Sequence, residues 1–151
     1  MNPPTAPNFP TGAIETGSQT ETERAGEGLG RTLRSGDVVL LYGDLGAGKT
    51  AFVRGLARGI DADPEQVSSP TFTIVQEYAG KSPNVTLFHV DLYRLEAPEI
   101  DDLGLEDLVS GAGIVAIEWA ERWRGRPDDA IEVTLKDLGD ERRAITVTRP
   151  R

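Results

Sequence analysis

The most informative stretch of this chain is Gly43-Asp44-Leu45-Gly46-Ala47-Gly48-Lys49-Thr50. These residues follow Asp37-Val38-Val39-Leu40-Leu41-Tyr42, a short apolar run typical of a central strand that is buried on both faces. A helix to about residue 58 is predicted directly after them. The pattern Gly-x-x-x-x-Gly-Lys-Thr between a strand and a helix is the P-loop, which binds nucleotide phosphates.

Each part of this loop has a physical task. Glycines let the backbone adopt positive φ angles and approach a phosphate closely. Successive N–H groups then form an anion-binding nest at the positive end of the following helix. Lys49 can reach the β- and γ-phosphates, and the Thr50 hydroxyl can ligate a bridging Mg²⁺. We therefore expect ATP and Mg²⁺ to be held by Lys49 and Thr50 together with Asp44, Leu45, Gly46, Ala47 and Gly48.

Two further apolar runs end in a carboxylate. Val85 to Val90 is followed by Asp91, and Gly113 to Ile117 is followed by Glu118. The carboxyl ends of parallel strands line the binding crevice of an open α/β sheet, so both side chains are expected beside the P-loop. Either carboxylate could ligate Mg²⁺ or position a water molecule.

Other polar residues give weaker signals. The loop Ser68 to Thr73 is hydroxyl-rich and could respond to a γ-phosphate, although its residues alone favour an ordinary turn. His89 is the only histidine, and its place in an apolar strand favours a packed, hydrogen-bonded ring. Trp119 is consistent with packing. We expect the remaining basic candidates to be solvated, although any of them could supply charge to a phosphate. They are Arg94, Arg122, Arg124 and Arg126.

The rest of the chain completes an α/β domain. A helix is predicted from about Glu21 to Leu33, capped by Thr20 or Thr22. A strand is predicted from Thr71 to Tyr78, and an acidic helix, broken near Gly104, from Pro98 to Leu108. Ile131 to Leu135 and Arg143 to Val147 alternate like a hairpin with one solvated face. The prediction is a P-loop fold whose sheet is mostly parallel, with helices on both faces and antiparallel edge strands.

Composition excludes several classes of protein. The 151 residues suit one domain, which we place at residues 17–151, after a Pro- and Thr-rich tail at 1–16 that we expect to be disordered. The net charge of −9 disfavours extended RNA binding by this surface alone. The absence of cysteine excludes disulfides and thiolate metal sites. With neither a signal-peptide pattern nor an apolar run long enough to span a bilayer, we expect a cytoplasmic protein that does not contact a membrane.

Four motifs, taken in their order along the chain, match the pattern of one known family. They are the P-loop, Ser69-Pro70-Thr71-Phe72-Thr73, His89-Val90-Asp91-Leu92-Tyr93-Arg94-Leu95 and Ile117-Glu118-Trp119. In this order they resemble the TsaE (YjeE) family, over about residues 18 to 135. The resemblance implies an ATPase, weak alone and stimulated by its partners TsaD and TsaB. Its role would be the threonylcarbamoylation of adenosine 37 in tRNAs that read ANN codons, with tRNA contacted only through the complex.

The resemblance also implies a role for each matching residue. Lys49 would bind phosphate, and Thr50 with Glu118 would hold Mg²⁺. Asp91 would be the acid of the second nucleotide motif, and Thr71 would belong to a switch-like loop. The helix start near Thr22 would lie beside the adenine. The catalytic set is then Lys49, Asp91 and Glu118, and the metal set is Thr50, Glu118 and Asp91.

Two other functions share the P-loop. A small-molecule kinase would need a lid and an acceptor pocket, and no arginine-rich lid segment is evident between the strands. A nucleotide-dependent binding module would bind ATP without meaningful turnover. ATP hydrolysis with and without TsaB and TsaD separates the module from an ATPase.

Overall fold

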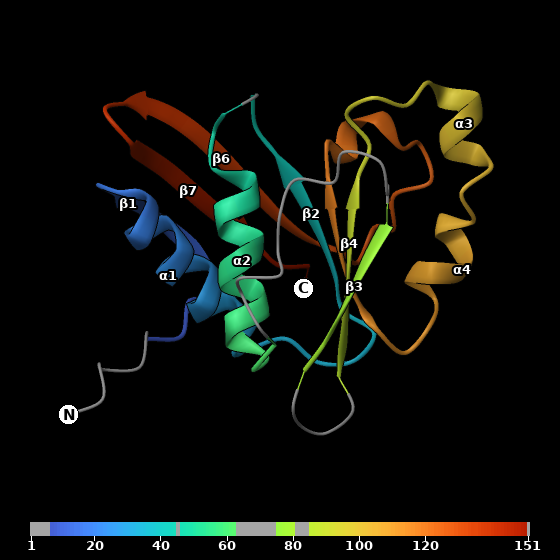
Figure 1. Cartoon of the computed structure of the whole chain (residues 1–151), viewed down its shortest axis with the longest axis horizontal. Helices are drawn as coiled ribbons and strands as arrows, with labels where there is room; N and C mark the ends of the chain where they lie inside the picture. Colours follow the sequence, from blue (N-terminus) through green and yellow to red (C-terminus); the bar gives the residue numbers. More distant parts are fainter. Residues whose placement is uncertain (1–6, 45, 63–74, 81–84, 151) are drawn as a thin grey trace.

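A computed structural model describes residues 7–44, 46–62, 75–80 and 85–150. Its strands form one seven-stranded sheet in the order β1-β7-β6-β2-β5-β4-β3 (Figure 1). In chain order they are β1 (Gly12–Thr16), β2 (Val38–Tyr42), β3 (Val75–Ala79), β4 (Thr86–Asp91), β5 (Ile114–Glu118), β6 (Ile131–Gly139) and β7 (Arg142–Thr148).

The centre of the sheet is parallel and both edges are antiparallel, as predicted. Strand β2 pairs in parallel with both β5 and β6, and β5 pairs in parallel with β4. At one edge, β7 joins β6 and β1 in antiparallel pairs, and at the other β3 lies antiparallel to β4. The predicted strand at 71–78 is confirmed from Val75 onward, and residues 71–74 lie outside the described residues.

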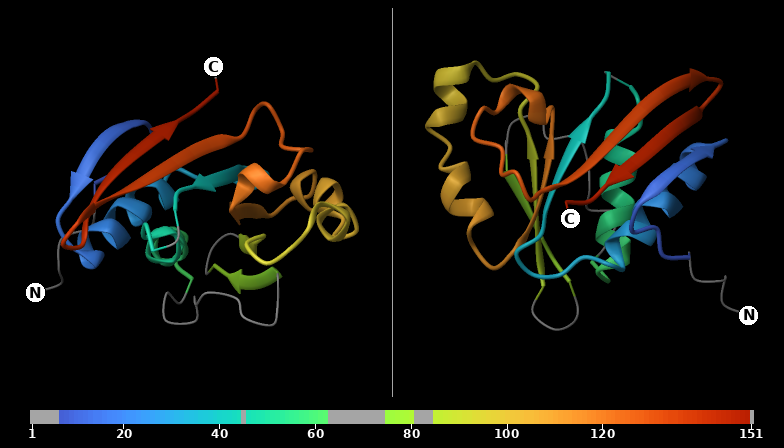
Figure 2. Two further views of the ribbon diagram at one scale, coloured as in Figure 1. Left: turned by 90° about the horizontal axis from the view of Figure 1, so that it is seen from above. Right: turned by 180° about the vertical axis from the view of Figure 1, so that it is seen from behind.

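Helices cover both faces of the sheet, again as predicted (Figure 2). Helices α1 (Gln19–Gly30) and α2 (Lys49–Gly59) pack on one face, in a core that includes Val39 and Leu41 of β2. Helices α3 (Ala97–Asp101) and α4 (Leu105–Val109), with the short η2 (Ala120–Arg122), pack on the other. That second core includes Val38 and Leu40. Alternate residues of β2 thus pack into two different cores on opposite faces of the sheet. This explains why the strand is apolar at every position.

Several helices and turns agree with the local signals in the sequence. Helix α2 is buried through Phe52, Val53 and Leu56. The predicted break at Gly104 is real, because this glycine has φ of 74° and separates α3 from α4. Strands β6 and β7 form the predicted hairpin with alternating burial, and it turns at Asp140 and Glu141, one residue later than predicted. None of the helices among the described residues is long and apolar enough to cross a bilayer.

The predicted disordered tail is wrong over residues 12–16. These residues form β1, whose Ile14 lies opposite Ile145 of β7. Further upstream, the Phe9 amide donates to the Gly28 carbonyl of α1. The low apolar content of this segment does not indicate disorder, because an edge strand with one buried residue, Thr16, needs little apolar sequence. Its order comes from backbone pairing with a strand far along the chain.

The predicted cap of the first helix also needs correction. Ser18, and not Thr20 or Thr22, caps α1, and its hydroxyl accepts a hydrogen bond from the Glu21 amide. The helix ends at Gly30, three residues earlier than predicted. Thr22 is therefore inside the first turn, where its side chain is free for another contact.

Helices α1 and α2 approach so closely that glycine is required between them. A Cβ atom on Gly26 would lie 2.1 Å from the carbonyl oxygen of Phe52, and one on Gly55 would lie 1.9 Å from that of Glu23. Both neighbours are backbone atoms, which cannot move as a flexible side chain can. This close contact fixes α2 against α1, and α2 carries the phosphate loop at its start.

Gly55→Ala is expected to lower the free energy of unfolding by about 3 kcal/mol or more, because overpacking against rigid backbone is at the costly end of such changes. Chemical denaturation measures the effect. Gly17→Ala is the control, since its Cβ would meet only side-chain atoms of Glu21 at 3.6 Å or more. Equal stability of the two variants would show that the two helices can separate without cost.

Candidate nucleotide-binding site

The phosphate loop and the two predicted carboxylates lie at the ends of three adjacent strands, at the same edge of the sheet. Strands β2, β5 and β4 run parallel, and the phosphate loop follows β2 directly. Asp91 and Glu118 are the last residues of β4 and β5, and they are partners in the strand register. Glu118 therefore lies beside the start of α2, as parallel strand ends in α/β sheets predict.

The loop has the backbone that a phosphate cradle needs. Gly46 and Gly48 have φ of 80° and 95°, in the left-handed region that favours glycine. A Cβ on Gly43 would lie 2.6 Å from the Leu135 carbonyl, so β6 packs closely beneath the loop. The Ala47 amide donates to the Asp44 carbonyl. Predicted loop residue Leu45 lies outside the described residues.

Lys49 is the first residue of α2 and is almost fully buried. Its ammonium donates to the Gly43 carbonyl and lies 3.5 Å from the centroid of the Trp119 ring. Burial lowers the pKa of Lys49 from its usual 10.5, and the Glu118 carboxylate opposes this shift. The ammonium is thus held at the mouth of the loop, largely stripped of water, where attraction to a phosphate is strong.

Thr50 and Glu118 form the pair that was predicted to hold a metal. The Thr50 hydroxyl donates to Oε2 of Glu118 at 3.4 Å. Glu118 is 3 % exposed, and the same Oε2 is 2.5 Å from Nε2 of His89. The described part of the chain, this site included, holds no group of three or more His, Cys, Asp or Glu side chains that could bind a metal by themselves. One hydroxyl and one carboxylate fit Mg²⁺, which usually takes one or two protein oxygens and completes its shell with phosphate and water.

Asp91 lies next to this pair but is oriented differently. Its Oδ1 accepts a hydrogen bond of 2.9 Å from the Tyr93 amide. Burial raises the pKa of Asp91 above its usual 3.8, and the nearby Glu118 adds to the increase, while the Tyr93 amide opposes it. Asp91 is thus an acid whose charge is costly in the folded protein.

Asp91→Asn is expected to raise the melting temperature at pH 7 without nucleotide or Mg²⁺. Because the folded pKa is raised, the unfolded chain ionises at Asp91 first as the pH rises above 3.8, so the folded state loses stability until its own carboxyl ionises. The advantage of the variant should therefore shrink as the pH is lowered toward 3.8. Thermal unfolding between pH 4 and 8 measures it, and a variant less stable than the parent at neutral pH would refute the argument.

Thr22 lies against the phosphate loop. It is 1 % exposed, its hydroxyl is 2.7 Å from that of Thr16 in β1, and its methyl carbon would be 3.4 Å from a Cβ on Gly48. The structure thus places Thr22 beside the phosphate loop, and its contact with the adenine stays a prediction. Predicted site residue Thr71, with the rest of the loop Ser68 to Thr73, lies outside the described residues.

Arg143 on β7 is a site residue that sequence reasoning missed. Its guanidinium donates to the Gly46 carbonyl at 3.1 Å, and its Nε would lie 3.4 Å from a Cβ on Gly48. The same side chain is 3.0 Å from the Asp137 carboxylate. Only the pairing of β7 with β6 brings it there. The separation of Arg143 from the phosphate loop in sequence gives no indication that the two are in contact.

Arg143→Ala is expected to weaken ATP binding about tenfold, since a charged donor would be lost beside the phosphate loop. Titration calorimetry with ATP and Mg²⁺ measures the change. Arg142→Ala is the matched control, because the Arg142 guanidinium donates to the Leu138 carbonyl within the hairpin. The assignment fails if both variants bind ATP equally well.

Aromatic rings close one side of the site. Trp119 has a left-handed backbone with φ of 59°, and its ring lies 4.9 Å from that of Tyr93. The Arg122 guanidinium is 5.7 Å from each ring and donates to the Leu95 carbonyl. Arg122 and Arg126 are exposed, as predicted, and Arg126 also donates to the carbonyls of Ala120, Glu121 and Trp123. These two arginines support the segment after β5.

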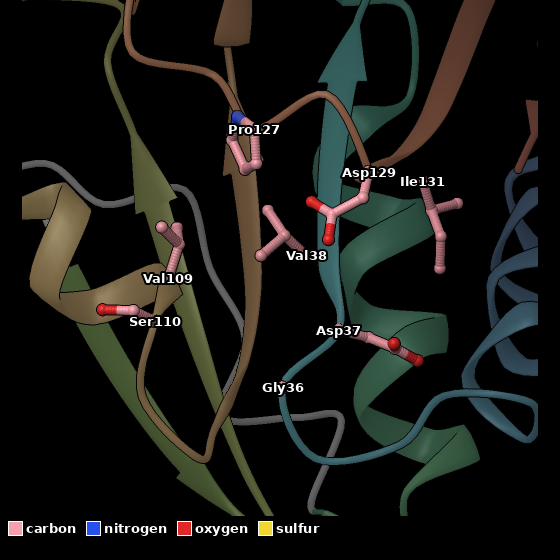
Figure 3. A pocket seen from close by; sticks show the side chains of 8 residues that line it. All are labelled: Gly36, Asp37, Val38, Val109, Ser110, Pro127, Asp129 and Ile131. Atoms are coloured by element: carbon pink, nitrogen blue, oxygen red, sulfur yellow. The ribbon is translucent and has the colours of Figure 1, made fainter. Parts of the chain in front are cut away.

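A cavity of about 310 Å³ lies at the opposite end of the strands (Figure 3). It is bordered by Asp37 and Val38 at the start of β2 and by Ile131 at the start of β6. The carboxylate of Asp129 and the ring of Pro127 also line it. None of the predicted site residues borders this cavity, so the candidate nucleotide site is separate from it.

Comparison with known proteins agrees with this geometry. A family model described as threonylcarbamoyl adenosine biosynthesis protein TsaE matches residues 16–145, which include the loop, both carboxylates and Arg143. The chain belongs to the TsaE family. The resemblance inferred from the four motifs is therefore confirmed.

Relatives and a solved structure match most of the chain. The tRNA threonylcarbamoyladenosine biosynthesis protein TsaE of Treponema pallidum is 43% identical over 132 residues, 86% of this chain and 95% of its own. The TsaE protein of a Nostoc strain is 50% identical over 118 residues, 75% of this chain and 70% of its own. The crystal structure of YdiB from Bacillus subtilis superposes with a TM-score of 0.70 at 32% identity, covering 92% of this chain and 85% of that one. The α/β fold is thus shared with this family.

Proposed function

We propose that this chain is a Mg²⁺-dependent ATPase that supports threonylcarbamoylation of adenosine 37 in tRNAs reading ANN codons, acting with TsaD and TsaB. One observation carries the proposal. The glycine loop, the desolvated Lys49 ammonium and the Thr50–Glu118 pair meet at the carboxyl edge of the sheet. Membership of the TsaE family supports the link to tRNA modification.

Each group at this edge has a task in ATP hydrolysis. The loop amides and Lys49 would bind and orient the phosphates, and Arg143 would add positive charge beside Gly46. Thr50 and Glu118 would hold Mg²⁺, which neutralises charge on the phosphates when bound. Asp91 lies one strand away, where a carboxylate can orient a water molecule or the hydration shell of the metal.

The surface charge supports docking to protein partners. A chain with a net charge of −9 is repelled by an RNA backbone. We propose that TsaD and TsaB contact the tRNA and that this chain acts on them in the cytoplasm. Hydrolysis would be slow without the partners, so that ATP turnover is tied to the assembled complex.

Phosphate release from ATP and Mg²⁺, measured with and without the TsaB–TsaD pair, tests the proposal. We expect slow release by the chain alone and clear stimulation by the pair. Lys49→Ala with the pair present is the control for contaminating ATPases. Unstimulated release would contradict the partnership, and phosphoryl transfer to small acceptors that exceeds transfer to water would favour a kinase.

A further inference from the structure

His89 lies at the centre of β4 and is the only histidine of the chain. Its side chain is completely buried, between the Tyr78 ring of β3 and the end of β5. Nε2 of His89 is 2.5 Å from Oε2 of Glu118. A fully buried polar ring that contacts a buried carboxylate requires a reason beyond packing, because an apolar residue would fill this strand position at lower cost.

The other ring nitrogen identifies which atom carries the hydrogen. Nδ1 of His89 has no hydrogen-bond partner within the described part of the chain. A neutral imidazole has one N–H donor and one lone pair, and a buried N–H without a partner is rarer than an unsatisfied acceptor. The favoured form therefore has its hydrogen on Nε2 and donates it to the Glu118 carboxylate, in a short charge-assisted bond.

This bond acts on the same oxygen that Thr50 contacts. Oε2 of Glu118 accepts from His89 on one side and from the Thr50 hydroxyl, at 3.4 Å, on the other. The bond to His89 restricts rotation of the carboxylate and keeps it beside the start of α2. Partners of this kind orient the oxygens that meet a metal, and their loss typically weakens metal binding about 10- to 100-fold.

We propose that His89 is a positioning residue that fixes the Glu118 carboxylate beside the Thr50 hydroxyl, ready for the Mg²⁺ that accompanies a nucleotide. The inference rests on the proposed function, because it requires that Glu118 meets this ion. His89 itself contacts neither nucleotide nor metal. Because His89 already holds the Glu118 side chain in place, Glu118 loses less conformational entropy when the ion binds.

Titration calorimetry with ADP, in excess EDTA and then over a Mg²⁺ series, tests the proposal without turnover. His89→Leu should bind ADP in EDTA as the parent does but need about 10-fold more Mg²⁺ for the metal-dependent gain. His89→Gln should restore the parental requirement, since its amide N–H can extend to the position of Nε2. Val90→Ala is the matched control, because it removes buried volume from β4 on the opposite face.

The outcomes separate this inference from the proposed function. A parent chain that shows no Mg²⁺-dependent ADP binding would overturn the proposed function. A parent that shows it, together with a folded His89→Leu of unchanged Mg²⁺ requirement, would overturn the role of His89 alone. A Mg²⁺ requirement raised as much by Val90→Ala as by His89→Leu would overturn it too, since the loss would then be structural.

Nitrogen NMR provides a second test that needs no variant. Because the chain has one histidine, its two ring nitrogens give signals that need no assignment to a residue. We expect Nε2 to carry hydrogen in the folded protein. A ring with hydrogen on Nδ1 and none on Nε2 could not donate to Glu118 and would overturn the proposal even if His89→Leu failed to fold.

Discussion

Replacing Lys49 with alanine is expected to lower the affinity for ATP and Mg²⁺ about 100-fold and to abolish stimulated hydrolysis. The ammonium lies at the mouth of the loop, against the Trp119 ring and the Gly43 carbonyl. Loss of a preorganised charge in a site that excludes water costs on the order of 3 kcal/mol. Titration calorimetry measures the affinity, and phosphate release with TsaB and TsaD measures the turnover.

Lys49→Met separates binding from folding. Methionine keeps a long apolar stem next to Trp119 but carries no charge. Because burial lowers the pKa of Lys49, its charged form is a cost to the folded state at neutral pH. Lys49→Met should therefore be at least as stable as the parent while losing the same affinity as Lys49→Ala. Either variant binding ATP with parental affinity would remove Lys49 from the site.

Glu118→Gln is expected to reduce Mg²⁺-dependent hydrolysis at least about 100-fold with little change in the melting temperature. The amide keeps the shape of the carboxylate and can still accept from His89, but it has no negative charge to bind a divalent cation. ATP binding without Mg²⁺ should persist, because the loop amides and Lys49 are unchanged. Phosphate release over a Mg²⁺ series, with partners present, measures the loss.

Asp129→Asn controls for the general loss of one negative charge. Asp129 lies by the cavity at the opposite end of the strands (Figure 3), so its replacement should leave the Mg²⁺ dependence unchanged. Normal hydrolysis by a purified Glu118→Gln would show that another group holds the metal. Asp91, the register partner of Glu118 on β4, would then be the first alternative.

The parts of the site that are local in sequence could be predicted. The glycines of the phosphate loop, together with the buried strand and the helix that flank it, predict the loop from sequence. Asp91 and Glu118 could be placed at one edge because each directly follows an apolar strand, and parallel strands end together. The break at Gly104 and the hairpin turn directly after Gly139 also follow from local residues.

The parts that depend on register could not be predicted. Strand β1 has little apolar sequence and is ordered by backbone bonds to β7. Arg143 reaches the loop because the β6–β7 hairpin aligns it there, and one residue of slip would turn it to the other face. Trp119, whose ring contacts Lys49, has a left-handed backbone. No local pattern predicts that conformation for an aromatic residue.

Nucleotide binding is the claim on which the catalytic and partner proposals rest. Titration calorimetry of the folded chain with ATP and Mg²⁺ tests it most directly, with Lys49→Met as the reference. We predict a saturable heat that fits one site and is weakened by chelation of Mg²⁺. A folded chain that produces no heat with ATP and Mg²⁺ would contradict the account.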